Sequence, residues 1–267
     1  MIWPRPFTAP LCENSIAMNE SVRNLFRTVQ VRFPALQSAK YTAKRFLTRT
    51  FGTLSEPDFH ALKLFPHLQD RLLLDVGANR GQSIEALLLV APQSRIMSFE
   101  ANGPLGQQLQ RVYRHHSRVT VHDFGLGDVE QTIRLYVPAY RRWRFDGLAS
   151  CSREEAAAAL KERILGYREA LVTIHEVPCL VRRLDAMNLD PFFIKLDVEG
   201  YEYHVLRGAE QTLRTHRPVL MVESPGSDTQ EFLEALGYER FAFLEGRFVR
   251  NQAGERNTFF MTADKVV

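Results

Sequence analysis

From Arg71 to the end of the chain, short apolar runs alternate with stretches in which apolar residues recur at helical spacing. This alternation is typical of a parallel β-sheet that is covered by helices on both faces. We therefore expect an α/β fold with a doubly wound, mostly parallel sheet. The predicted strands are Leu72–Gly77, Arg95–Ala101, Val119–Gly125, Phe192–Asp197 and Pro218–Glu223, and the predicted helices are Gln82–Val90, Pro104–His116, Tyr203–His216 and Thr229–Leu236.

The pattern changes near the C-terminus. Two β-rich runs, Tyr238–Leu244 and Asn257–Thr262, are joined by a polar stretch that contains Gly246 and Gly254. They predict a C-terminal antiparallel hairpin. In a dinucleotide-binding domain the sixth strand is normally parallel and follows another helix, so this ending departs from that architecture.

The segment before the alternating region has a helical pattern. Apolar residues between Val22 and Val29 fall on one helical face, and a second, basic stretch at Leu36–Thr48 follows Pro34. We expect an N-terminal helical segment over residues 18–70, after a disordered extension over 1–17. The favoured interpretation is a pair of helices that pack on the domain; the alternative is that residues 18–50 form an arm that contacts a membrane surface or a partner.

Residues 139–170 interrupt the alternation inside the main domain, which we place at residues 71–267. The interruption begins with Arg141-Arg142-Trp143-Arg144 and continues with an alanine-rich predicted helix at Glu154–Tyr167. It lies between the third and fourth predicted strands. We interpret it as an inserted lid or substrate-recognition segment.

Composition narrows the class of protein. With 45% apolar and 24% charged residues, the 267-residue chain resembles an ordinary globular protein. Its three cysteines, Cys12, Cys151 and Cys179, are too widely spaced for a disulfide framework or a zinc site, so we expect a cytoplasmic setting. The longest apolar run, Ala86–Ala91, is far shorter than the roughly 20 residues that span a bilayer, and no transmembrane segment is expected.

The net charge of +3 is unevenly distributed. Residues 1–50 carry eight Lys and Arg against Glu13 and Glu20, a balance of +6 that leaves −3 for residues 51–267. A nucleic-acid-binding domain usually presents a basic footprint on its functional part. We therefore expect no nucleic-acid partner.

The first predicted strand ends in a glycine-containing loop, Asp75-Val76-Gly77-Ala78-Asn79-Arg80-Gly81. Ligands of open α/β sheets bind beyond the carboxyl ends of the strands, where the strand order reverses. Glycines allow close approach, and the helix that starts near Gln82-Ser83 offers free N–H groups to an anion. Asp75 could accept a hydrogen bond from a ligand ammonium. The G-x-x-x-G spacing differs from G-x-G-x-x-G and counts against NAD.

The next two strand ends extend this site. Glu100 closes the second predicted strand, where a carboxylate can hold both ribose hydroxyls of a nucleoside, and Asn102 lies beside it. The third strand ends with Asp123, an acceptor for an adenine amino group, and Phe124, an aromatic cover for the ring; the alternative is a simple turn. Three successive strand ends indicate a nucleoside site, and the C-terminal hairpin favours a methyltransferase that uses S-adenosylmethionine.

The fourth predicted strand places Lys195, Asp197 and Glu199 on one face of an extended chain. The structural alternative is a Lys–Asp pair that closes the strand end. Transfer of a methyl group to an alcohol needs alignment and removal of a proton, which Asp197 or Glu199 could take. Either could instead hold a divalent cation such as Mg²⁺ together with Glu223, and the sequence does not choose. His204 is a further, less favoured candidate for the general base.

At this point the sequence resembles the FkbM-type methyltransferases. The similar segments are residues 75–83, Phe99-Glu100-Ala101-Asn102, Leu184-Asp185, residues 194–202, Gly208-Ala209 and Arg217-Pro218, ending at Glu223. The resemblance implies a Rossmann-like class I methyltransferase fold and O-methylation of a hydroxyl, often on a glycoconjugate sugar or a polyketide natural product. Ala101 replaces the usual proline of that family. The insertion and the N-terminal helices lie outside the resemblance.

We therefore expect an S-adenosylmethionine-dependent O-methyltransferase that acts on a small-molecule or glycan acceptor. Two alternatives stay open: an RNA or protein methyltransferase, suggested by the basic N-terminal segment and Arg141–Arg144, and a non-catalytic nucleoside-binding scaffold. The expected cofactor-binding residues are Asp75, Gly77, Ala78, Asn79, Gly81, Gln82, Ser83, Glu100, Asn102, Asp123 and Phe124.

Overall fold

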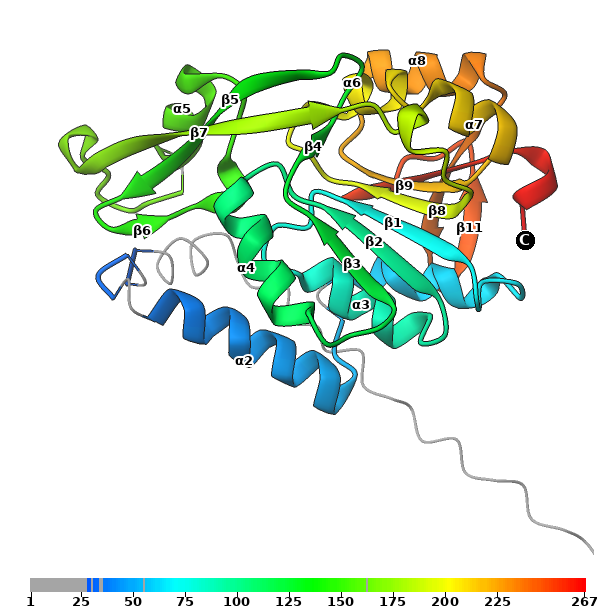
Figure 1. Ribbon diagram of the computed structural model, residues 1–267, viewed down its shortest axis with the longest axis horizontal. Coiled ribbons are helices and arrows are strands. Elements are labelled where there is room, and N and C mark those ends of the chain that lie inside the picture. Colours follow the sequence, from blue (N-terminus) through cyan, green and yellow to red (C-terminus); the bar gives the residue numbers. More distant parts are fainter. Residues whose placement is uncertain (1–27, 30, 34–35, 55, 162) are drawn as a thin grey trace, which may run out of the picture.

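The computed structural model describes residues 28–29, 31–33, 36–54, 56–161 and 163–267 (Figure 1). The predicted extension over residues 1–17 and most of the first N-terminal helix lie outside the described residues. The described chain forms two β-sheets. The larger sheet carries helices on both faces, and the smaller sheet stands over one end of it (Figure 1).

The larger sheet has eight strands in the order β11-β10-β12-β9-β8-β1-β2-β3. Strands β3, β2, β1, β8 and β9 run parallel, and β12, β10 and β11 pair antiparallel. The sheet begins at β1; β2 and β3 are added on one side of it, and β8 and β9 are added later on the other side. The strand order therefore reverses between β1 and β8. The bounds are β1 Leu72–Val76, β2 Arg95–Phe99, β3 Val119–His122, β8 Pro191–Leu196, β9 Val219–Glu223, β10 Glu239–Leu244, β11 Arg247–Arg250 and β12 Asn257–Met261.

The C-terminal strands differ from the predicted hairpin. The polar stretch between the two β-rich runs contains a third strand, β11, and the tight hairpin is β10–β11. Its turn residues Glu245 and Gly246 both have positive φ, which matches the twist of a two-residue hairpin. Strand β12 then returns between β9 and β10. The sequence signal of β11 is weak because its two apolar residues lie between arginines.

The helices form two layers. Helices α2 (Leu36–Phe51), α3 (Gln82–Val90) and α4 (Gly103–Tyr113), with the 3-10 helix η1 (Pro57–Leu64), cover one face, and the other face is covered by α6 (Glu202–Arg207), α7 (Glu210–His216) and α8 (Ser227–Ala235). The single helix predicted at 203–216 is divided in two. Asp185 causes the division, because its N–H binds the Gly208 carbonyl and its carboxylate accepts hydrogen bonds from the backbone of Gln211 and Thr212 in α7.

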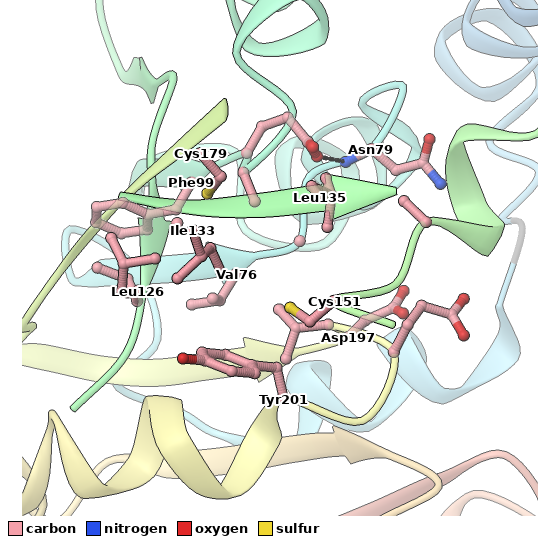
Figure 2. Close-up of a pocket in the computed structure, with 18 of the residues that line it drawn as sticks. Val76, Asn79, Phe99, Leu126, Ile133, Leu135, Cys151, Cys179, Asp197 and Tyr201 are labelled. Atoms are coloured by element: carbon pink, nitrogen blue, oxygen red, sulfur yellow. Dashed lines mark hydrogen bonds between the residues drawn. The ribbon is translucent and has the colours of Figure 1, made fainter. Parts of the chain in front are cut away.

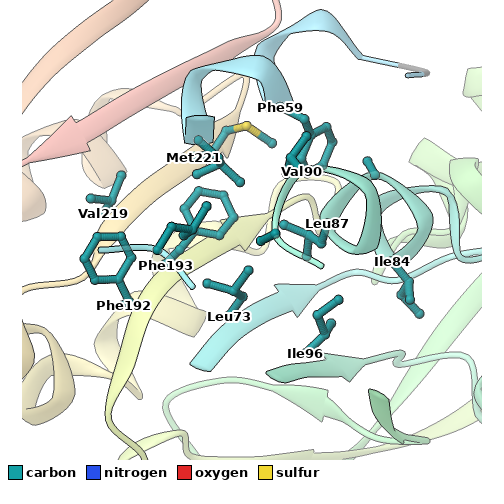
Figure 3. Packing of buried hydrophobic residues seen from close by; sticks show 14 of the residues in the cluster. Phe59, Leu73, Ile84, Leu87, Val90, Ile96, Phe192, Phe193, Val219 and Met221 are labelled. Carbon is teal, nitrogen blue, oxygen red and sulfur yellow. The ribbon is translucent and has the colours of Figure 1, made fainter. Parts of the chain in front are cut away.

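Alternate residues of the same strands build the two cores. On one side Leu73 and Phe193 pack with Phe59 of η1 and with Ile84 and Leu87 of α3 (Figure 3). On the other side the neighbouring strand residues pack under α6, α7 and α8. Strands that are buried on both faces have near-continuous apolar sequences, and for this reason the strands of the larger sheet could be predicted.

The smaller sheet was not predicted. The expected third strand ends at His122, and the chain turns through Asp123 and Phe124 into this sheet, whose order is β4-β7-β5-β6. Its long pair β5 and β7 flanks the 139–170 insertion, and the predicted alanine-rich helix is shorter than expected. The bounds are β4 Gly125–Leu126, β5 Gln131–Tyr140, β6 Trp143–Arg144, β7 Val172–Arg182 and α5 Arg153–Lys161, with 3-10 turns η2 Asp146–Leu148, η3 Glu169–Leu171, η4 Asp185–Met187 and η5 Ala263–Lys265.

Helix length and composition bear on membrane insertion. Across the described part of the chain, no helix combines the length and the apolar character needed to cross a membrane.

Candidate functional site

A cavity lies at the carboxyl ends of β1, β2 and β8, between the two sheets. Its empty space, open solvent included, is about 750 Å³. Figure 2 shows Ile133, Leu135 and Cys179 of the smaller sheet on one side of the cavity and Asp197 and Tyr201 on the other. The lining residues are Val76, Gly77, Asn79, Phe99, Glu100, Ala101, Gly125, Leu126, Ile133, Leu135, Asp146, Gly147, Ala149, Cys151, Cys179, Val181, Asp197, Val198, Glu199 and Tyr201.

Gly77 joins the ends of β1 and β8. Its φ is +88°, and a Cβ atom there would lie 1.8 Å from the Asp197 carbonyl oxygen. Any side chain would therefore push the Asp197 backbone away. Gly81 also has a left-handed φ, +84°, and forms the N-cap of α3. The close approach at Gly77 places the glycine-containing loop Asp75–Gly81, here called the cofactor loop, and the loop after β8 that carries Asp197 at the same cavity.

Glu100 directly follows β2 and lines the cavity. Its two carboxylate oxygens accept hydrogen bonds from the backbone N–H of Asn79 (2.6 Å, drawn in Figure 2) and of Asn102 (2.8 Å). Burial raises the pKa of this carboxyl to about 7, although both N–H donors oppose the shift. Each oxygen keeps a second lone pair, so Glu100 can still accept two hydrogen bonds from a ligand in the cavity.

Behind the cavity, a buried polar group supports the loop. Asp75 is fully buried and accepts a hydrogen bond from the Ser98 hydroxyl at 3.0 Å, and its other oxygen lies 3.8 Å from the Lys195 ammonium. Lys195 itself is 2% exposed and donates to Asp197 at 2.9 Å. Burial lowers the pKa of Lys195, but the negative charges of Asp197 and Asp75 outweigh it and raise the pKa above its usual value.

Asp197 follows β8 and connects this buried lysine with Glu223. Burial raises the pKa of Asp197, but Lys195 and a hydrogen bond with Glu223 outweigh that effect and lower it. The pKa of Glu223 is raised to about 7 by burial and by the neighbouring charge of Asp197. Glu223 also accepts from the Arg256 guanidinium at 3.0 and 3.3 Å. At neutral pH Asp197 is therefore the charged member of the pair.

Glu199 is held in an unusual backbone conformation. Its φ is +50°, a left-handed value that a non-glycine residue adopts only when neighbouring contacts hold it there. The holding contact comes from Glu202, whose carboxylate accepts hydrogen bonds from the N–H groups of Val198 and Gly200 at 3.2 Å each. Burial and the charge of Asp197 raise the pKa of Glu199 to about 7.

A second cavity opens next to the first. It shares Asp197 and Glu199 with the first cavity, and the other residues around it are mostly acidic or small. The carboxylates of the two residues therefore stand between two spaces. The lining residues are Asp197, Glu199, Gly200, Glu202, Tyr203, Glu223, Ser224, Gly226, Asp228 and Thr229.

The insertion closes over the cofactor loop, as a lid would. Asp146 forms an ion pair with Arg80, in which Nε donates at 3.0 Å, and the side chains are 5% and 11% exposed. Gly147 packs so close to the Asn79 amide that a Cβ would lie 2.9 Å from it. Together with Ala149 and Cys151, these two insertion residues line the cavity. The insertion therefore contributes directly to the cavity wall.

The predicted cofactor residues divide into two groups. Gly77, Asn79 and Glu100 line the cavity, whereas eight others lie behind or beside it: Asp75, Ala78, Gly81, Gln82, Ser83, Asn102, Asp123 and Phe124. Phe124 is buried against Phe99 and His122, and Asp123 lies 3.4 Å from Gln107. The structure thus does not bring Asp123 and Phe124 to the position expected for adenine contacts, because the chain turns there into the smaller sheet; Gly125 and Leu126 form that part of the wall.

The predicted catalytic residues are also divided. Asp197 and Glu199 line both cavities, and Lys195 lies behind them in the Lys–Asp pair that the sequence left as an alternative. His204 lines neither cavity. Its ring stacks on Tyr201 with centroids 4.6 Å apart, and its Nδ1 lies 3.3 Å from Asp128. This position does not suit a general base in either cavity.

The residues of the smaller sheet that line the cavity were missed by the sequence reasoning. Ile133 and Leu135 alternate with the polar residues Thr132 and Arg134, the period of a strand, and this signal was present in the sequence. Asp146 carries no comparable signal, because its contact with the cavity depends on how distant segments meet.

The predicted metal site does not fit the observed contacts. Glu223 is paired with Arg256, and Asp197 is paired with Lys195 and hydrogen-bonded to Glu223. The cations already balance these carboxylates. Within the ranges that the structure describes, no group of three or more His, Cys, Asp or Glu side chains is arranged to hold a metal ion.

The fold and cavity define an α/β protein with a cavity at the carboxyl ends of its parallel strands. The model of the Methyltransferase FkbM domain matches residues 75–249, more than half of the chain. The chain therefore belongs to the FkbM methyltransferase family.

Individual relatives are more distant. AMB antimetabolite synthetase AmbE from Pseudomonas aeruginosa is 28% identical over 165 residues, which are 53% of this chain and 8% of AmbE. Methyltransferase FkbM from Methylobacillus flagellatus is 18% identical with a TM-score of 0.45, over 91% of this chain and 60% of that chain. A SAM-dependent O-methyltransferase from Thermotoga maritima is 10% identical with a TM-score of 0.36, over 83% and 70% of the two chains. The chain thus spans a small part of AmbE and less than two thirds of the Methylobacillus chain.

Proposed function

We propose that this methyltransferase uses S-adenosylmethionine to methylate a hydroxyl group of a saccharide or natural product. The observation that carries the proposal is the pair of joined cavities: one has a ribose-type carboxylate, Glu100, and apolar walls, and the other is rich in carboxylates. Asp197 and Glu199 stand at their junction.

The residues around the first cavity fit S-adenosylmethionine. Glu100 has two free acceptor positions for the ribose hydroxyls, and Val76, Phe99 and Leu126 offer an apolar surface for the adenine. The other ionisable side chains of the lining, apart from thiols and a phenol, are the carboxylates of Asp146, Asp197 and Glu199. Arg80 and Lys195 pair with Asp146 and Asp197, so the lining carries no excess of positive charge that would repel a sulfonium, the group that S-adenosylmethionine carries. When bound, the sulfonium supplies an electrophilic methyl group.

The residues at the junction divide the work on the acceptor. Glu199 takes the proton of the attacking hydroxyl, because its pKa of about 7 suits proton transfer near neutral pH. Asp197, whose pKa is lowered, stays charged and orients the hydroxyl as a hydrogen-bond acceptor. The new bond joins the acceptor oxygen to the methyl carbon, the carbon–sulfur bond breaks, and the proton moves to Glu199.

The second cavity supports a neutral or cationic acceptor with several hydroxyls. Its carboxylates, Glu199, Glu223 and Asp228 among them, can accept hydrogen bonds from sugar hydroxyls, whereas they repel phosphate. This charge disfavours the alternative of an RNA substrate. The alternative of a non-catalytic scaffold predicts cofactor binding without any turnover.

A pair of variants tests these roles. Glu199→Gln should lower kcat by about 10²- to 10⁴-fold, the usual contribution of a general base, and weaken the pH dependence near pH 7, to which Glu100 and Glu223 also contribute. Asp197→Asn should raise KM for the acceptor and lower kcat as well, with cofactor affinity unchanged. Glu130→Gln is the control, because Glu130 is exposed and lines neither cavity; its kcat and KM should stay at the wild-type values.

The assay is transfer of a labelled methyl group to a panel of saccharides and natural products, with mass spectrometry of the products. Methylation only at nitrogen or carbon would contradict the proposal. Cofactor binding without turnover on any extract fraction would favour the scaffold alternative.

A further inference from the structure

Helix α2 packs on the domain through its polar face. Arg49 donates to Glu85 of α3 through Nε and Nη2, both at 2.6 Å, and Glu85 is 2% exposed. Arg45 donates to the carbonyl of Arg80 at 3.3 Å, and the Arg80 guanidinium lies 4.7 Å from the ring centroid of Tyr41. Most surface helices bury an apolar stripe and expose charges. In α2 the arrangement is reversed.

The apolar residues of α2 therefore face outward. Phe46 is 62% exposed, Leu47 48% and Phe51 69%. At 100° per residue these three side chains fall within one half of the helix, with Leu47 and Phe51 opposite Arg45 and Arg49 and with Phe46 at the side, about 60° from Arg49. Phe33, just before the helix, is 56% exposed. A grouping of large exposed apolar side chains of this kind marks a surface that meets another apolar phase.

Basic side chains border this apolar face. Arg32 lies before α2, and Arg141 and Arg142 lie at the turn between β5 and β6; the three line one recess with Val31. The Lys40 ammonium of α2 lies 5.9 Å from the ring of Trp143 in β6, which joins the recess to the helix. Residues 28–54 contain no Asp or Glu. In Figure 1, α2 runs along the lower edge of the molecule below β6.

We propose that this α2 face, Phe33, Phe46, Leu47 and Phe51 with Arg32, Arg141 and Arg142, docks the protein on an anionic lipid surface. Aromatic and aliphatic side chains enter the boundary between headgroups and acyl chains, while the guanidinium groups pair with lipid phosphates. Charge favours this occupant over a second copy of the chain, because two copies of α2 would bring like charges together. The proposal is independent of the methyl-transfer reaction.

Vesicle sedimentation of the full chain tests the proposal. We expect binding to vesicles of equal parts phosphatidylglycerol and phosphatidylcholine, weak binding to pure phosphatidylcholine, and release at high salt. The triple variant Phe46→Ser, Leu47→Ser, Phe51→Ser should lower partitioning by about tenfold for each side chain removed from the lipid. Arg141→Gln with Arg142→Gln should lower it by about fivefold for each lost charge.

A matched control is Leu244→Ser. Leu244 is 40% exposed and lies in β10, next to the edge strand β11 of the larger sheet rather than on α2. It should bind vesicles as the wild type does. Circular dichroism melts of all variants should coincide, because the substituted side chains are exposed.

Three outcomes would overturn the proposal. The wild type could stay in the supernatant with anionic vesicles, or the triple variant could bind them as well as the wild type does. Alternatively, sedimentation velocity could detect a dimer that the triple variant lacks, without vesicle binding, which would assign the face to a second copy of the chain.

Discussion

Replacing Glu100 by glutamine removes one carboxylate oxygen from the floor of the cofactor cavity. In the wild type both oxygens accept backbone hydrogen bonds, from Asn79 at 2.6 Å and from Asn102 at 2.8 Å. Glutamine keeps one oxygen and replaces the other with an NH₂ group, which cannot accept. One backbone N–H and one ribose hydroxyl therefore lose their acceptor.

The free-energy effect of Glu100→Gln differs between cofactor binding and folding. A hydrogen bond to a charged group contributes about 1.5–3 kcal/mol, so the affinity for S-adenosylmethionine should fall by about 10- to 100-fold. Folding also loses a charged hydrogen bond, but it no longer has to bury a charge. The pKa of Glu100 is raised from 4.5 to about 7, which corresponds to a burial cost of about 3 kcal/mol at high pH. The two effects on folding nearly cancel.

Isothermal titration of S-adenosylmethionine, with thermal melts of the same samples, is the assay. Glu85→Gln is the control, since Glu85 is 2% exposed and does not line the cavity. It should lower the melting temperature, because Arg49 loses its carboxylate partner and one of its two hydrogen bonds, while the folded protein binds the cofactor normally. If Glu100→Gln bound the cofactor with wild-type affinity, the ribose assignment would be refuted.

Three further predictions concern the loop and its cover. Gly77→Ala should destabilise the fold by more than about 3 kcal/mol, measured by urea unfolding, because its Cβ would lie 1.8 Å from the Asp197 carbonyl; wild-type stability would show that the close approach is not needed. Arg80→Met should cost up to about 3 kcal/mol of stability and weaken cofactor binding, since it leaves the buried Asp146 with only Arg144, whose Nε lies 3.7 Å away, and an unchanged melt would contradict a closed lid. The pKa of Glu100 is higher in the folded protein than in the unfolded chain, so its contribution to stability is full below pH 4.5 and decreases by about 3 kcal/mol as the pH rises through 7. The free energy of unfolding of Glu100→Gln, measured across this range, should lack this decrease. An equal decrease in the variant would assign the pH dependence to other groups.

Much of the larger sheet could be predicted from the sequence, for a clear physical reason. Strands such as Leu72–Val76 and Val219–Glu223 are buried on both faces and read as unbroken apolar runs between helical patterns. Helix α3 has the predicted bounds, since the loop glycine fixes its start. The strand ends then identified Glu100 and Asp197, because polar residues that close a buried strand must meet a partner or a cleft.

The smaller sheet and the walls of the cavity could not be predicted as easily. Strands β5 and β7 each contain a proline, Pro138 and Pro178, which weakens the strand signal even though the alternation is present. The direction of Phe124 depends on the turn after His122, and no local pattern encodes that turn. The pKa values of Asp197 and Glu199 likewise depend on burial and on charges that the fold brings close, such as Arg256.

The central claim is that Glu199 removes a proton from a hydroxyl while a methyl group enters from the cavity of Glu100. Its most direct test is single-turnover transfer of a deuterated methyl group from S-adenosylmethionine to a saccharide or natural-product acceptor, with the product located by NMR. We predict that the wild type forms a deuterated methyl ether at one hydroxyl. Glu199→Gln should bind the cofactor but not form this ether. A label on nitrogen or carbon, or equal rates for the two proteins, would contradict it.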